Sequence, residues 1–339
     1  MANGMMTQND QKRRLCGRMA AEVEMTAEDR EKLRRKLIRA SLCMTRQCWE
    51  QGILAYALYQ TGENELAEAM ADDMVIRQST DGRLCNVEDT PAVTDSAFCI
   101  PVVWQLGKRE NGGRYREAAE KNIRYFLYDA ERTEDGVLYH MRGTRQVWAD
   151  SAAFLPYSLA LTGHPEEACR QMKGLLACLC IPETGLYGHI RDMASGSFVD
   201  GRPWGVGNGW ILTGLLRTAL QLPASQGREE LILTFRQLLR RMMAYQDADG
   251  GFHDDLTDPD SFEETETTAM VALSIREAGT RGILDAAEMR AYAQAEQNMR
   301  TFVLDRIDEQ GRATGSSGSP SFDHPGTSVE SQAHVIMLL

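Results

Sequence analysis

The sequence has 339 residues, more than a single domain usually contains, so it can hold two domains or one large repeat architecture. Its 37 basic and 49 acidic residues leave a net charge of −12, which argues against nucleic acid or an anionic membrane surface as the main partner. Hydrophobic residues make up 43% and charged residues 25% of the chain, values that exclude wholesale disorder.

The N-terminal segment, residues 1–25, is polar and then basic, and it lacks the apolar stretch of a secretory signal. No window approaches the roughly 18 consecutive apolar residues of a membrane span. The eight cysteines lack the paired spacing of a metal site, so we interpret them as small buried thiols in a reducing compartment. We therefore expect a cytoplasmic protein without a membrane span, a metal or another cofactor.

One kind of turn recurs along the chain. Each copy has a polar residue, a glycine and a short segment, which in three copies ends in an aromatic residue and a histidine. The glycines are 49 to 65 residues apart, about the length of two helices with their connections, which indicates a repeat of helical hairpins. The turn glycines are Gly82, Gly136, Gly185, Gly250 and Gly311.

The segments between these turns have helical periodicity. In one of them Leu231, Phe235, Leu238, Leu239 and Met242 recur at the spacing of one helix face. The same reasoning predicts twelve helices. In chain order they cover residues 26–43, 46–60, 63–78, 94–107, 112–130, 147–162, 165–180, 208–222, 227–246, 263–278, 285–304 and 326–339.

Twelve helices in six hairpins predict an all-α fold, an (α/α)6 barrel in which an inner and an outer layer close into a ring. We expect residues 26–339 to form this single catalytic domain. The alternative is an open α-solenoid of the same hairpins. The turns share aromatic, His and Asp residues at one end of the repeat, and this favours the ring.

Two aspartates, Asp95 and Asp150, each open a predicted inner helix directly after a turn segment. A carboxylate at that position either caps its own helix or faces the mouth of the ring. Aromatic neighbours and mutual repulsion would raise the pKa of one carboxyl, so that it could act as a general acid.

The string Pro203–Trp210 contains three glycines and two tryptophans. It reads either as a helix-entry turn with packed Trp side chains or as the wall of a sugar pocket, which we favour. Of the three turn histidines, His140, His189 and His253, we place His189 in this pocket because it is nearest in sequence to the string.

Two loops receive a simpler interpretation. The acidic run Asp254–Asp260 lacks the ligand spacing of a calcium loop, so we expect a solvated loop before a helix. The Gly/Ser-rich stretch Gly315–Pro320 predicts a flexible loop that covers the mouth of the ring.

Several motifs together resemble the unsaturated rhamnogalacturonyl hydrolases of glycoside hydrolase family 105, which are related to the unsaturated glucuronyl hydrolases of family 88. The resemblance runs in order from about residue 45 to the C-terminus. The motifs that carry it are Trp49–Gly52, Trp148–Asp150, Trp204–Trp210, Tyr245–Asp247 with Gly250–His253, Asp258–Ser261 with Glu264–Met270, and Gly326–Glu330.

This resemblance implies an enzyme that removes a 4,5-unsaturated uronic acid from the non-reducing end of an oligosaccharide left by a polysaccharide lyase. An Asp protonates C4 of the enol ether, water adds at C5, and the hemiketal opens and releases the remaining sugar. Asp150 takes the role of proton donor and water activator, and Asp95 that of supporting carboxylate. The implied substrate-binding residues are His189, Trp204, Trp210, Asn208, Trp148 and Trp49.

One position departs from the family pattern. Members usually carry Arg where this chain has Val206, and an isopropyl group cannot replace a guanidinium that binds the polar groups of the uronic acid. Either another arginine reaches the site or the substrate differs there. The candidate arginines are Arg142, Arg145, Arg191 and Arg202.

Two other functions remain open. The same barrel and carboxylates could hydrolyse a saturated glycoside. Alternatively, Val206 could mark a sugar-binding protein that has lost catalysis. In each case we expect an oligosaccharide ligand and a monomer or homodimer.

Overall fold

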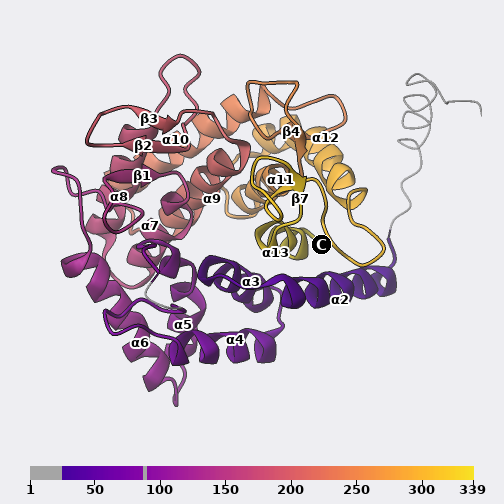
Figure 1. The fold of residues 1–339 in the computed structure, drawn as a ribbon. Coiled ribbons are helices and arrows are strands. Elements are labelled where there is room, and N and C mark those ends of the chain that lie inside the picture. The colour runs from indigo at the N-terminus through magenta and orange to yellow at the C-terminus, as the bar shows by residue number, and fades with distance from the viewer. Residues whose placement is uncertain (1–24, 87–89) are drawn as a thin grey trace, which may run out of the picture.

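The computed structural model describes residues 25–86 and 90–339, so the predicted N-terminal segment lies outside the described residues except for its last position. The described helices form a ring with an inner and an outer layer (Figure 1). The inner helices are α3 (Cys48–Gln60), α5 (Ile100–Gly107), α7 (Ser151–Leu161), α9 (Gly205–Gln221), α11 (Thr265–Thr280) and α13 (Val329–Leu338). The outer helices are α2 (Ala27–Met44), α4 (Asn64–Ile76), α6 (Gly113–Arg124), α8 (Pro165–Leu179), α10 (Gln226–Met243) and α12 (Ala286–Leu304).

The ring closes between the two ends of the described chain, because α13 packs against α3. Successive inner helices also contact one another, α7 with α9, α9 with α11 and α11 with α13. This closure confirms the predicted (α/α)6 barrel and excludes the open solenoid.

The two layers differ in which sides of their helices are apolar. Every residue of α7 from Ser151 to Ala160 is buried, because neighbours surround an inner helix. The outer helix α10 buries only the apolar face predicted from its periodicity, and arginines such as Arg240 lie on its other side.

The backbone conformation of the five glycines confirms the recurring turn. All five of its glycines have positive φ angles, from 67° to 102°, a conformation that L-residues with a side chain seldom adopt. Isolated β-bridges close three of these turns into short hairpins, namely Arg132 with Leu138, Cys180 with Tyr187, and Ile307 with Ala313.

Short strands lead into several inner helices and collect at one end of the ring. They form three small sheets, all antiparallel. The strands are β1 (Gln146–Trp148), β2 (Ile190–Asp192), β3 (Phe198–Asp200), β4 (Phe252–His253), β5 (Glu263–Glu264), β6 (Ser316–Ser317) and β7 (Pro325–Gly326).

These strands correct some predicted boundaries. The helix predicted over 147–162 begins only at Ser151, because Val147 and Trp148 pair with β2 instead. The stretch predicted as a flexible loop contains β6, which pairs with β7, and both of its serines are buried, with the hydroxyl of Ser316 bonded to that of Ser331. The helix predicted from residue 208 already begins at Gly205, so the glycine motif is largely helical.

Two predicted helices change type along their length. The helix expected over 94–107 starts as a 3₁₀ turn, η1 (Asp95–Phe98), before α5. The helix expected over 112–130 ends as a π-helical turn, η2 (Tyr125–Asp129). None of the helices in the described part of the chain combines the length and apolar character needed to cross a bilayer.

The close packing of α7 and α9 gives a test of the fold. A Cβ atom added at Gly214 would lie 1.9 Å from the backbone oxygen of Ala152. We expect Gly214→Ala to lower the free energy of unfolding by about 1–3 kcal/mol, measured by urea denaturation, because backbone cannot move aside as a flexible side chain can.

The matched control is Gly113→Ala at the start of α6, where no atom lies within 4 Å of the added Cβ. That variant should be neutral or more stable by up to about 1 kcal/mol, since alanine favours helix. Equal destabilisation by both substitutions would contradict the close approach.

Candidate active site

Asp150 occupies the N-cap position of α7, yet its side chain makes no capping hydrogen bond to the helix. Its Oδ2 atom instead lies 3.3 Å from Nε2 of His189. Burial acts to raise the pKa of Asp150, but the contact with His189 and the charges of His189 and His140 outweigh burial and lower it. Asp150 is therefore an ionised carboxylate directed away from its own helix.

His189 precedes β2 and lies between two carboxylates. Its Nδ1 atom is 3.0 Å from Oδ2 of Asp200, opposite the contact with Asp150. Burial acts to lower the pKa of His189, but Asp150 and Asp200 together raise it to about 9. The imidazole is thus protonated at neutral pH. Trp148 and Trp204 contact its ring, with ring centroids 5.7 and 4.4 Å away.

Asp95 begins η1 and is buried near a second histidine. Its Oδ1 atom lies 3.5 Å from Nε2 of His140. Burial raises the pKa of Asp95, the charge of His140 opposes this, and the nearby Asp150 adds to the rise. The pKa values of Asp95 and Asp150 thus move in opposite directions, as expected for two carboxyls with different roles in acid–base chemistry.

His140 joins the site although the sequence analysis did not place it there. Its Nδ1 atom lies within hydrogen-bonding distance of the hydroxyls of Thr94, at 2.7 Å, and Ser151, at 3.1 Å. Its ring stacks on Trp148, with centroids 4.4 Å apart. The repeated aromatic-histidine ending of the turns was the signal that could have identified it.

Trp204 is buried and held by a carboxylate on the next hairpin. Its indole N–H donates to Oδ1 of Asp254 at 3.0 Å. Burial raises the pKa of Asp254 to about 6, although Trp204 and Arg202 act to lower it. The solvated loop predicted for the acidic run is therefore wrong for Asp254, which is 3% exposed, because it serves as the acceptor for Trp204.

Of the four candidate arginines, Arg202 adjoins the site. Its guanidinium lies 2.9 Å from Asp200 and 3.6 Å from Asp254. Arg191 instead donates to the backbone oxygens of Cys178 and Gly196.

The two other candidates lie elsewhere. Arg142 donates to the backbone oxygen of Thr90 and lies 3.8 Å from Asp81. Arg145 is exposed in the loop before β1.

The side of the mouth formed by α11 and α13 carries two glutamates that sequence reasoning named only within motifs. Glu330 accepts a hydrogen bond from the indole of Trp49, and burial raises the pKa of Glu330 to about 7. Glu266 is also buried, and burial followed by the charge of Glu330 raises its pKa well above the usual value. Asp150 raises both values further, so these carboxyls belong to the same mouth.

Two predicted substrate-binding residues lie beneath the mouth. Asn208 is fully buried, and its amide bonds the backbone of Tyr187 and Trp204. Trp210 packs in the core against the rings of Phe98 and His334, with centroids 5.5 and 5.1 Å away. The structure thus brings Asp95, Asp150, His189, Trp148 and Trp204 together, with Trp49 across the mouth beside Glu330.

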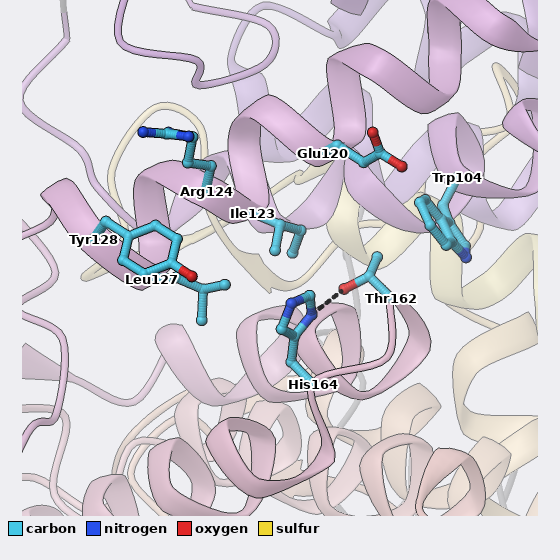
Figure 2. Close-up of a pocket in the computed structure, with 8 residues that line it drawn as sticks. All are labelled: Trp104, Glu120, Ile123, Arg124, Leu127, Tyr128, Thr162 and His164. Carbon is cyan, nitrogen blue, oxygen red and sulfur yellow. Dashed lines mark hydrogen bonds between the residues drawn. The ribbon is translucent and has the colours of Figure 1, made fainter.

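Three further features share no side chain with this site. A cavity of about 290 Å³ opens between α6, η2 and the turn before α8, and its lining includes Trp104, Tyr128 and His164 (Figure 2). Among the described residues, two groups of side chains have the spacing of metal ligands. They are Asp247 with Asp249 and Glu263, and Cys48 with Cys85 and Cys99.

Comparison with known proteins gives consistent matches. The model of Glycosyl Hydrolase Family 88 matches residues 13–329. Unsaturated rhamnogalacturonyl hydrolase YesR of Bacillus subtilis strain 168 is 26% identical over 285 residues, covering 78% of each chain. These findings confirm the resemblance seen in the sequence motifs.

Solved structures agree in fold. A possible member of the GH105 family from Klebsiella pneumoniae superposes with a TM-score of 0.76 at 19% identity, covering 94% of this chain and 93% of that one. Unsaturated glucuronyl hydrolase from Bacillus sp. GL1 gives a TM-score of 0.66 at 17% identity, covering 85% and 84% of the two chains. At these identities the likeness supports the fold alone.

Because the pKa of His189 is raised in the folded protein, the protonated imidazole makes a pH-dependent contribution to the free energy of unfolding. The pKa rises from 6.5 to about 9 on folding, so this contribution is complete below about pH 6.5 and is lost as pH rises through 9. We expect the difference in unfolding free energy between wild type and His189→Gln to shrink by at most about 3 kcal/mol between pH 6 and pH 10. Urea denaturation at both pH values measures it.

The control is His164→Gln, because His164 lines the cavity of Figure 2 and contacts none of the site carboxylates. Its difference from wild type should change little over the same interval. A pH-independent difference for His189→Gln would show that the imidazolium is not stabilised by Asp150 and Asp200.

Proposed function

The chain belongs to glycosyl hydrolase family 88, and we propose that it removes a 4,5-unsaturated uronic acid from the non-reducing end of an oligosaccharide. The observation that carries this proposal is the pair of Asp150 and protonated His189, with Asp95 beside it. The relative YesR, named as an unsaturated rhamnogalacturonyl hydrolase, supports the substrate class.

In the proposed reaction the pair of Asp150 and His189 supplies one proton. The proton passes from Nε2 of His189 to Asp150 over their 3.3 Å contact, and Asp150 delivers it to C4 of the enol ether. A water molecule adds its oxygen at C5 and returns its proton to the pair. The C5 hemiketal then opens to a ketone and leaves a hemiacetal at C1, which forms an aldehyde and releases the remaining sugar as its alcohol.

Asp95 supports this reaction through its raised pKa. Burial and the charge of Asp150 make protonation of Asp95 less costly than that of an exposed carboxyl, and a protonated Asp95 would remove a second negative charge from the mouth and could donate a hydrogen bond to the sugar. Trp148 and Trp204 flank His189, which limits the access of water to the proton that it holds.

Asp150→Asn tests the proposal directly. Disappearance of the enol ether is followed by its ultraviolet absorbance, on unsaturated disaccharides produced by pectin and glycosaminoglycan lyases. We expect the variant to lose about 10²–10⁴-fold in kcat, the usual contribution of a positioned acid–base group. Asp135→Asn, at an exposed turn position outside the site, is the matched control and should keep wild-type activity.

Other outcomes identify other functions. Turnover of a saturated glycoside without loss of the enol ether would support an ordinary glycosidase. Tight sugar binding without turnover by wild type would support a non-catalytic protein. A larger loss in Asp95→Asn than in Asp150→Asn would assign the proton donor to Asp95.

We assign recognition of the substrate carboxylate to Arg202, in place of the arginine that Val206 replaces. Three carboxylates lie near the guanidinium, Asp200 at 2.9 Å, Asp323 at 3.5 Å and Asp254 at 3.6 Å, yet the Arg202 side chain remains 40% exposed and can be reached from solvent. It directly precedes the segment that carries Trp204, which contacts His189. Arg202 therefore presents a planar cation at the edge of the proposed sugar site.

Arg202→Met tests this assignment with a pair of substrates. Wild type should prefer the free uronic acid over its methyl ester, because the ester lacks the charge that Arg202 binds. The variant should lose about 10- to 100-fold in kcat/KM on the acid, as expected for a hydrogen bond to a charged group, and little on the ester.

Arg191→Met is the control, since Arg191 binds backbone oxygens outside the site. It should keep the preference for the acid. An equal loss on acid and ester in Arg202→Met would instead indicate that Arg202 acts only by holding Asp200.

A further inference from the structure

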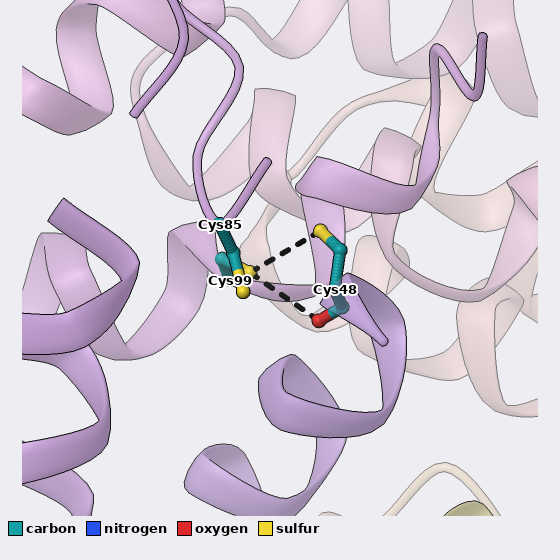
Figure 3. A group of neighbouring side chains, drawn as sticks. All are labelled: Cys48, Cys85 and Cys99. Carbon is teal, nitrogen blue, oxygen red and sulfur yellow. Dashed lines mark hydrogen bonds between the residues drawn. The ribbon is translucent and has the colours of Figure 1, made fainter. Parts of the chain in front are cut away.

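Three cysteines from separate segments meet beneath the mouth of the ring. Cys48 is the first residue of α3, Cys85 lies in the loop after α4, and Cys99 directly follows η1. Their sulfur atoms all lie within 4.8 Å of one another, and those of Cys48 and Cys99 are 3.8 Å apart (Figure 3). The chain thus gathers three soft donor atoms at one point.

The distances between the sulfur atoms match those of thiolates that bind one shared metal ion. Sulfur atoms about 2.3 Å from a central metal lie roughly 3.8 Å apart in a tetrahedral arrangement and roughly 4.0 Å apart in a trigonal one. The contact between Cys48 and Cys99 already has this separation. Cys85 and Cys99 are buried, whereas Cys48 is partly exposed and gives an ion a route of entry.

The backbone at Cys85 is unusual for its residue type. Its φ angle is +56°, and Cys85 is the only residue other than glycine with a positive φ among the described residues. L-residues avoid this conformation, and such strain concentrates at functional positions. Backbone hydrogen bonds of Cys85 to Met74 and of Asn86 to Arg77 hold the loop in place.

A positive charge lies beside the sulfurs. The guanidinium of Arg77 donates to Sγ of Cys85 at 3.0 Å and also binds Asp73 and Gln51. A fixed cation at this distance stabilises negative charge on sulfur. It would also offset the excess charge of three thiolates around a single ion.

We propose that Cys48, Cys85 and Cys99 form a three-thiolate binding site for a soft metal ion of the Cu(I), Zn²⁺ and Cd²⁺ class. Thiolate sulfur selects such ions over hard cations, and three donors without a fourth protein ligand favour an ion that accepts trigonal coordination, such as Cu(I). On binding, three metal–sulfur bonds form, thiol protons leave to solvent, and no electron is transferred.

The bound ion would connect the two segments that carry site residues. Cys48 directly precedes Trp49, and Cys99 follows the same short helix that begins with Asp95. A metal at this point fixes the start of α3 relative to η1. It therefore supports the mouth of the ring structurally without contacting the substrate.

Cd²⁺ is the probe, because its binding to thiolates produces ultraviolet charge-transfer absorption. The reduced full-length chain is titrated anaerobically, and bound metal is measured after gel filtration. We expect each chain to bind one Cd²⁺ ion tightly, and the bound ion to raise the thermal unfolding midpoint. Cys85→Ser and Cys99→Ser should each lose the tightly bound ion and the charge-transfer band, while Cys169→Ser, which lies outside the group, should keep both.

Three results would overturn the proposal. The first is the failure of the folded wild-type chain to bind one Cd²⁺ ion tightly, a result that does not depend on any variant. The second is unchanged binding in both Cys85→Ser and Cys99→Ser, which would locate the metal elsewhere. The third is ready formation of a disulfide between Cys48 and Cys99 in a chain that binds no Cd²⁺ after reduction, which would identify a redox pair instead.

Discussion

The buried imidazolium of His189 is the charge on which the mouth of the ring depends. A cation removed from water is costly unless carboxylates lie beside it, and here Asp150 and Asp200 contact its two nitrogens. Asp200 is itself held by Arg202, so the charges alternate in sign from Asp150 outward. This alternation keeps a proton within reach of Asp150, and Trp148 and Trp204 shield it from solvent.

The ring supplies the geometry for these charges because its inner helices present their N-terminal ends at one rim. Asp150 and Glu264 occupy N-cap positions of α7 and α11, and Glu330 lies in the first turn of α13. The positive end of each helix dipole favours a carboxylate there. Several helix N-termini at one rim also make the electrostatic potential of the mouth more favourable to an anionic sugar than the net charge of −12 suggests.

The sequence contains local information about the fold but little about contacts between hairpins. Gly82 and Gly250 need positive φ angles that few other residues adopt, so the turns could be recognised without a structure. Periodicity located the helices for the same reason. The strand β1 was missed because three residues carry too little alternation, and its pairing with β2 depends on a segment more than 40 residues away.

The same distinction separates the site residues that were predicted from those that were not. Asp95, Asp150 and His189 stand beside recognisable turns, so their residue types and places were informative. The burial of Asp254 and the meeting of Cys48 with Cys99 arise only when separate hairpins close into the ring. Spacing along the chain does not reveal such contacts.

The position of Arg202 has a further consequence under the proposed function. Val206 is buried on α9, whereas Arg202 lies before that helix and shares Asp200 with His189. A substrate carboxylate that binds Arg202 competes with Asp200 for the same guanidinium. Asp200 then interacts more strongly with His189 and favours its charged form. Under the proposed function, recognition of the substrate anion and retention of the proton on His189 would therefore be coupled through one carboxylate, Asp200.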